Sequence, residues 1–207
     1  MNRFSLFPTP VFVFDLPIPS EVNDELVRRL VAEEQASPGV ARSNIGGWHS
    51  VPDLTLRQEP CYQRLIQSIV EHVAFVMNGL ARESGRPPMQ FNFGVQGWAM
   101  VMRNSHYITI HDHGDAHWSV AYYADAGDAG EAPSGQLAFV DPRRSGRTIP
   151  NADLFESSFA VTPRTGALVI FPGWLQHYVH EYRGTRPRVS ISCNLTLEPV
   201  QGPPPPR

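Results

Sequence analysis

The chain has 207 residues, 42% hydrophobic and 18% charged, which is enough to enclose an apolar core. A formal net charge of −3 and a pI near 6.2 argue against nucleic acid as the main partner, because phosphate binding requires a basic surface. Two cysteines, no N-terminal pattern typical of a signal peptide and no apolar run of about 18 residues predict a reduced, cytoplasmic protein that neither relies on disulfides nor enters a membrane.

The N-terminal part predicts one strand followed by two helices. Prolines exclude a helix from Leu6–Leu16, so this segment is expected to be an edge strand, which could pair with a second copy in a homodimer. An apolar stripe at helical spacing predicts a helix with Ser20 as its N-cap and an end before Ser37. A second amphipathic helix is expected from Cys61 to Arg82, with a broad apolar face for packing on a sheet.

The segment from Ala41 to Pro60 lacks periodicity and is expected to be a loop. Gly46 and Gly47 before Trp48 predict a tight turn that presents the tryptophan. Two interpretations stay open: the loop covers the core, or it faces a substrate.

From Met89 onward the apolar pattern changes to period two, with turn residues between short segments. The expected strands are Gln90–Met102, Tyr107–His113, Trp118–Ala124, Gln136–Val140, Ser157–Val161, Ala167–Phe171, Tyr178–Glu181 and Arg188–Leu197. About eight such strands favour a mainly β fold with flanking helices, a jelly roll or barrel. We expect one domain: residues 1–88 supply the N-terminal strand and supporting helices, 89–198 form the β core, and 199–207 are a proline-rich tail.

The segment Tyr107–Tyr123 carries metal-ligand side chains at every second position: His111, His113, Asp115 and His117. On a strand, side chains two residues apart point to the same face, so neighbouring members of this set can bind one ion. His177 is the candidate third ligand from a distant segment. Neutral imidazoles suit iron, copper, zinc or nickel, and three protein ligands leave open coordination positions.

The last predicted strand places polar side chains on one face: Arg188, Ser190, Ser192 and Asn194. Inside a small barrel such a stripe costs free energy unless a polar ligand binds there. An arginine beside hydroxyl groups can clamp a carboxylate through its planar fork. The alternative is that this face simply meets solvent.

The order of these elements (metal-ligand strand, distal histidine, arginine about ten residues later) resembles that of the Fe(II)/2-oxoglutarate-dependent oxygenases, and more narrowly a bacterial and phage group within that superfamily. The resemblance rests on six segments: LFPTPVF, SNIGGWHS, HDHGDAHWSVAYY, GQLAFVDPR, GALVIFPGWLQHYVHEY and RVSISCNL. They are short, but their order and spread over most of the chain make the match specific.

The resemblance implies a double-stranded β-helix, cupin-like, that uses Fe(II), 2-oxoglutarate and O2 to oxidise an unactivated C–H bond. Hydroxylation of a small-molecule or amino-acid-like substrate, with release of succinate and CO2, is the expected reaction. The implied iron ligands are His111, His113 and His177. The resemblance assigns the tail carboxylate of 2-oxoglutarate to Arg188, assisted by Ser190 and Tyr123.

Several alternatives remain open. His113-Gly114-Asp115 is a literal His-x-Asp, so Asp115 is a rival to His111 as an iron ligand. A cupin-like three-histidine dioxygenase would keep the metal ligands without using 2-oxoglutarate, and a non-enzymatic ligand-binding jelly roll would need no metal. Five further residues are candidates for the substrate pocket or for purely structural roles: Trp48, His49, Arg103, His117 and Trp118.

Overall fold

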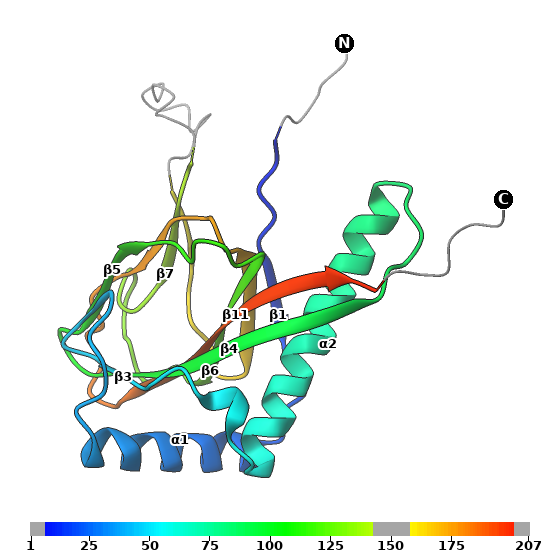
Figure 1. Cartoon of the computed structure of the whole chain (residues 1–207). Coiled ribbons are helices and arrows are strands. Elements are labelled where there is room, and N and C mark those ends of the chain that lie inside the picture. Colours follow the sequence, from blue (N-terminus) through cyan, green and yellow to red (C-terminus); the bar gives the residue numbers. More distant parts are fainter. Residues whose placement is uncertain (1–6, 143–157, 201–207) are drawn as a thin grey trace, which may run out of the picture.

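The computed structural model describes residues 7–142 and 158–200, and within them it shows two antiparallel sheets and two α-helices (Figure 1). The six-stranded sheet contains, in spatial order, β1 (Phe12–Asp15), β9 (Ala167–Pro172), β6 (Trp118–Asp125), β11 (Arg188–Pro199), β4 (Phe91–Met102) and β3 (Trp48–His49). The five-stranded sheet contains β2 (Asn44–Ile45), β5 (Tyr107–His111), β10 (His177–Val179), β7 (Leu137–Val140) and β8 (Ser158–Val161). This arrangement is the predicted jelly roll, a double-stranded β-helix. The proline-rich tail, 201–207, lies outside the described residues.

Both helices, α1 (Ser20–Ala36) and α2 (Pro60–Glu83), cover the face of the six-stranded sheet that points away from the other sheet (Figure 1). Their apolar stripes pack on outward side chains of β11 such as Ile191 and Leu195. No helix in the described part of the chain combines the length and apolarity needed to cross a bilayer.

β11 separates two environments, because successive side chains of a strand point to opposite faces. Its apolar set belongs to the core under the helices: Val189, Ile191, Cys193, Leu195 and Leu197. The polar set beginning with Arg188 therefore faces the interior of the roll, which is the first of the two interpretations that the sequence left open. The long ladder between β4 and β11 fixes this register, with Arg188 opposite Met102 and Asn194 opposite Gln96.

Both helices lie within one residue of their expected bounds, but the expected cap is wrong. Pro19 occupies the N-cap position and Ser20 is the first helical residue, with no side-chain bond capping the helix. The ψ of 144° at Pro19 is extended, so the helical conformation begins only at the next residue.

The expected loop from Ala41 to Pro60 contains β2, β3 and a short 3-10 helix (Leu54–Leu56). Gly46 turns the chain between β2 and β3 with a φ of +79°, where a Cβ would collide with the ring of His106. Trp48 is buried and its indole N–H donates to the Ser37 carbonyl at 3.0 Å, so this tryptophan covers the core.

Candidate active site

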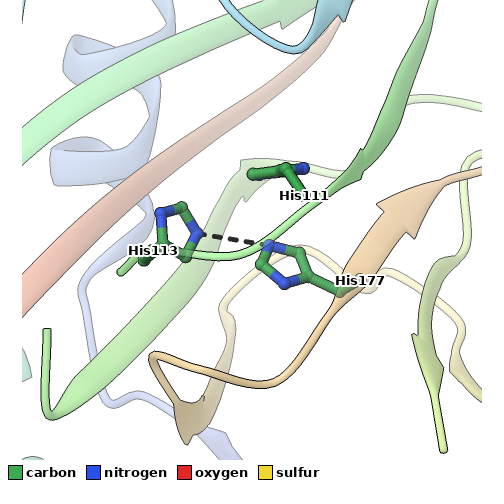
Figure 2. A group of neighbouring side chains, drawn as sticks. All are labelled: His111, His113 and His177. Atoms are coloured by element: carbon green, nitrogen blue, oxygen red, sulfur yellow. Dashed lines mark hydrogen bonds between the residues drawn. The ribbon is translucent and has the colours of Figure 1, made fainter. Parts of the chain in front are cut away.

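Three histidines, from two paired strands and the turn after one of them, converge on one point. His111 is the last residue of β5, His113 follows it by two positions, and His177 begins β10 directly opposite His111. One ligand nitrogen from each residue lies within 4.8 Å of the others. Figure 2 shows the rings of His113 and His177 meeting at their Nε2 atoms, with His111 beside them.

The path of the chain after β5 determines which candidates join this cluster. The strand was expected to reach His113, but it ends at His111, and Gly114 turns the chain with a φ of +54°. The His113 amide donates to the Gly173 carbonyl at 2.9 Å, which keeps His113 beside the loop that leads to His177. Asp115 lies beyond the turn and is exposed, outside the group of converging ligand atoms.

Backbone carbonyls orient two of the three rings. The Nδ1 of His111 lies 2.8 Å from the Thr109 carbonyl, and the Nδ1 of His177 lies 2.8 Å from the Leu175 carbonyl. An Nδ1–H that donates to a carbonyl leaves Nε2 unprotonated and able to bind a metal. The Nε2 atoms of His113 and His177 are 3.2 Å apart. Two nitrogens at this separation can both reach one ion at a bond length of about 2.1 Å.

The protonation states also suit a metal. Burial, with a smaller contribution from the neighbouring His111, lowers the pKa of His177 to about 3 and that of His113 to about 4. Burial lowers the pKa of His111 as well. All three imidazoles are therefore neutral at physiological pH, the form that ligates metals. Three neutral nitrogens on one side of an ion fit Fe(II) and leave positions for other ligands.

The histidines open into a cavity of about 490 Å³ between the two sheets. Its floor consists of inward side chains of β4, β6 and β11: Gln96, Trp98, Met100, Ala121, Tyr123, Arg188, Ser190, Ser192 and Asn194. The polar stripe of the last strand therefore faces an internal cavity and not the surrounding solvent.

Arg188 is the feature of this cavity that most needs a ligand. Its side chain is fully buried, and its Nη1 contacts only Met102 Sδ at 3.2 Å and Ser190 Oγ at 3.4 Å. Its Nε–H and the Tyr123 hydroxyl have no hydrogen-bond partner, and no salt bridge joins Arg188 to an acidic residue in the described segments.

Burial lowers the pKa of Arg188, but a guanidinium remains charged at neutral pH. A buried, unpaired cation is costly, so this end of the cavity is complementary to a carboxylate that can accept several hydrogen bonds. Burial raises the pKa of Tyr123, which keeps its hydroxyl protonated and able to donate to the same group.

Of the five further pocket candidates, only His49 lines the cavity. Trp118 donates to Met77 Sδ at 3.1 Å, Arg103 pairs with Glu34, and His117 Nδ1 accepts the Leu197 amide. These three, like Trp48, have structural roles.

Sequence reasoning missed the inward residues of β4, Gln96, Trp98 and Met100. The period-two pattern of this strand was visible, and pairing its even positions with the polar stripe of the last strand would have identified them.

Comparisons with known proteins agree with the geometry. Residues 96–194 match the family described as "Putative 2OG-Fe(II) oxygenase". This stretch, just under half of the chain, is similar to enzymes that use Fe(II) and 2-oxoglutarate. No curated protein sequence matches it significantly.

Solved structures share the fold at low sequence identity. A prolyl-4-hydroxylase from Pseudomonas putida is 16% identical over 90% of this chain and 92% of its own, with a TM-score of 0.59. HygX from Streptomyces hygroscopicus, with nickel and 2-oxoglutarate bound, is 12% identical over 90% and 82%, with a TM-score of 0.63. A prolyl hydroxylase from Trichoplax adhaerens, bound to a hypoxia-inducible-factor peptide fragment, is 16% identical over 89% and 82%, with a TM-score of 0.55.

Proposed function

We propose that this enzyme oxidises, and most often hydroxylates, an unactivated C–H bond of a small-molecule or amino-acid-like substrate. The reaction consumes 2-oxoglutarate and O2 and releases succinate and CO2. In this proposal His111, His113 and His177 hold Fe(II), and Arg188, Ser190 and Tyr123 hold the tail carboxylate of 2-oxoglutarate.

One observation carries the assignment: a buried guanidinium without an anionic partner shares a cavity with three converging imidazoles. A cupin-like dioxygenase that does not use 2-oxoglutarate would need the histidines alone, and it gives no reason to bury the charge of Arg188. A diacid that reaches from the metal to the arginine accounts for both features.

The residues of this chain bind, orient and shield the reactants. Arg188 and the hydroxyls of Ser190 and Tyr123 fix one end of the co-substrate, so that its other end faces the histidines. When bound, Fe(II) supplies the oxidising chemistry, in which decarboxylation of 2-oxoglutarate is coupled to oxidation of the substrate C–H bond. The apolar walls around the cluster, including Phe171, limit access of water.

The size and charge of the cavity support a small, polar substrate. About 490 Å³ lies within the range of small-molecule sites and holds the co-substrate with a ligand of modest size. Two exposed residues of opposite charge line it, Arg42 and Asp112, and neither forms a salt bridge within the described part of the chain. Arg42 precedes β2 and Asp112 follows β5, and these two strands pair, so both charges lie at one edge of the five-stranded sheet. A zwitterion such as an amino acid complements this pair.

Anaerobic titration tests the proposal. Adding 2-oxoglutarate to the Fe(II)-loaded protein should produce a metal-to-ligand charge-transfer absorption band, and admitting O2 should then yield succinate. His177→Ala, which removes one imidazole, should give neither signal. Iron binding without the band would favour the cupin-like alternative, and succinate formation equal to that of His177→Ala would refute the proposal.

A further inference from the structure

The ring of His113 lacks the anchor that its two partners have. The Nδ1 atoms of His111 and His177 each meet a backbone carbonyl, whereas that of His113 has no hydrogen-bond partner in the described segments. Aromatic packing restrains the ring instead. Trp98 lies 5.6 Å away between ring centroids, at an interplanar angle of 46°, and Phe171 lies 6.4 Å away at 44°.

Trp98 is itself held by a second histidine. The ring of His49 stacks on it almost in parallel, with centroids 5.7 Å apart and an interplanar angle of 7°. No ring contact joins His49 to His113 directly, so Trp98 connects the two. Both His49 and Trp98 line the cavity.

His49 is well placed to hold the tryptophan because its own position is fixed. It is 9% exposed, its Nδ1 lies 2.6 Å from the Ser50 carbonyl, and it pairs with Met100 in the ladder between β3 and β4. Ser50 also holds the end of β3 against β4, because its amide donates to the Ala99 carbonyl and its hydroxyl accepts a hydrogen bond from the Ala99 amide, both at 3.0 Å.

We propose that Trp98 is the positioning residue for His113, and that His49 holds Trp98 in the orientation this task requires. The inference rests on the proposed function in that it takes His113 as an iron ligand. Partners behind metal ligands usually act by hydrogen bonding, and their loss costs about 10–100-fold in metal affinity. Here a series of ring contacts from His49 through Trp98 to His113, beginning at an edge strand, takes the place of the missing carbonyl.

Metal affinity measured without turnover tests the inference. Co(II) binding should be followed by its ligand-field absorption, and the 2-oxoglutarate band of the Fe(II) protein should be recorded anaerobically. Trp98→Leu should weaken Co(II) binding by about 10–100-fold and shift both spectra, because the His113 ring gains rotational freedom. Trp98→Phe should restore most of the affinity, because it keeps an aromatic face beside the ring.

Variants of His49 test the second half of the proposal. His49→Ala should weaken Co(II) binding, and His49→Phe should restore it, because stacking and not the imidazole nitrogens supports Trp98. Phe139→Leu is the matched control: Phe139 lies 6.1 Å from the ring of His177, which the Leu175 carbonyl already orients. This control should change Co(II) affinity little.

The outcomes separate this inference from the proposed function. Wild-type protein that binds neither Co(II) nor Fe(II) with 2-oxoglutarate contradicts the proposed function. If the wild-type protein binds these ligands and Trp98→Leu leaves affinity and spectra unchanged, the role of Trp98 is wrong and the proposed function stands. Equal losses of Co(II) affinity in Trp98→Leu and Phe139→Leu would also contradict the role of Trp98. Thermal unfolding of each metal-free variant shows whether it is folded. If Trp98→Leu does not fold, the His49 variants decide: equal Co(II) affinity in His49→Ala and His49→Phe would contradict the support of Trp98 by ring stacking.

Discussion

The guanidinium of Arg188 lies over the ring of Tyr123, 4.9 Å from its centroid, and both side chains line the cavity. This cation–π contact compensates only part of the cost of burying the charge, because the Arg188 Nε–H and the Tyr123 hydroxyl both lack partners. The protein therefore keeps an unfavourable arrangement that a bound carboxylate would relieve.

Replacing Arg188 by methionine should separate stability from co-substrate binding. In Arg188→Met, an apolar chain of similar length joins Met102 and removes an unpaired buried charge, so the melting temperature without ligand should stay equal or rise. In wild-type protein, 2-oxoglutarate at 100 times its Kd should add about 2.7 kcal/mol to the free energy of unfolding, and the variant should lose this gain. A lower melting temperature with a preserved response to 2-oxoglutarate in a thermal-shift assay would contradict both expectations.

The choice between His111 and Asp115 as iron ligand is open to a direct comparison. His111→Ala should abolish the anaerobic 2-oxoglutarate band and succinate formation, because it removes one of the three converging nitrogens. Asp115→Ala should leave both signals near wild type, because this carboxylate is exposed beyond the turn at Gly114. The reverse pattern would show that the turn rearranges when the metal binds and that Asp115 replaces His111.

The sequence allowed prediction of elements whose own pattern carries the information. The alternation from Arg188 to Leu197 predicts both the strand and its division into an apolar and a polar face, because one face had to join an apolar core. β2 and β3 have two residues each, too few for any period to be visible, so the segment around Trp48 was expected to be a loop.

Long-range pairing explains what sequence reasoning got wrong or left open. The approach of His177 to His111 depends on the ladder between β5 and β10, which no local pattern encodes. Trp98 and Trp118 both belong to strands that pair with β11, yet one lines the cavity and the other donates to Met77 under the helices. The register with β11 distinguishes them: Trp98 lies opposite Ser192, which faces the cavity, whereas Trp118 lies opposite Leu195, which faces the helices.

Acid should loosen the loops beside Arg188 through Asp128. The hydrogen bond from the Thr185 hydroxyl, followed by those from the Arg186 amide and the Tyr182 hydroxyl, lowers the pKa of this carboxyl to about 2. A carboxyl whose pKa is lower in the folded state stabilises the fold above its ordinary pKa of about 3.9 and loses that contribution as the pH falls towards 2.

Asp128→Asn should therefore melt at a lower temperature than wild type at pH 6, and the difference should narrow between pH 4 and pH 2. Thermal unfolding monitored by circular dichroism across this range provides the measurement. A difference that stays constant with pH would show that the charge of Asp128 is not what stabilises these loops.

The last prediction concerns Arg57, which follows the short 3-10 helix and bonds to residues of both α-helices. Its guanidinium binds both carboxylate oxygens of Glu33, at 2.6 and 2.9 Å, and also reaches Asp53 and the hydroxyl of Tyr62. Burial lowers the pKa of Arg57, but the hydrogen bonds to Glu33 and Asp53 outweigh it and raise the pKa overall. The side chain is only 16% exposed, so its loss leaves partly buried carboxylates without a partner.

Arg57→Met should lower the free energy of unfolding by about 1–3 kcal/mol, the usual cost of removing hydrogen bonds to charged groups. Arg28→Met is the matched control: Arg28 pairs with Glu25 on the exposed face of α1, where ion pairs add little. Urea denaturation measures both changes, and the 2-oxoglutarate band of the Fe(II) protein should persist in each folded variant. Equal destabilisation by the two substitutions would show that the Arg57 cluster acts as an ordinary surface ion pair.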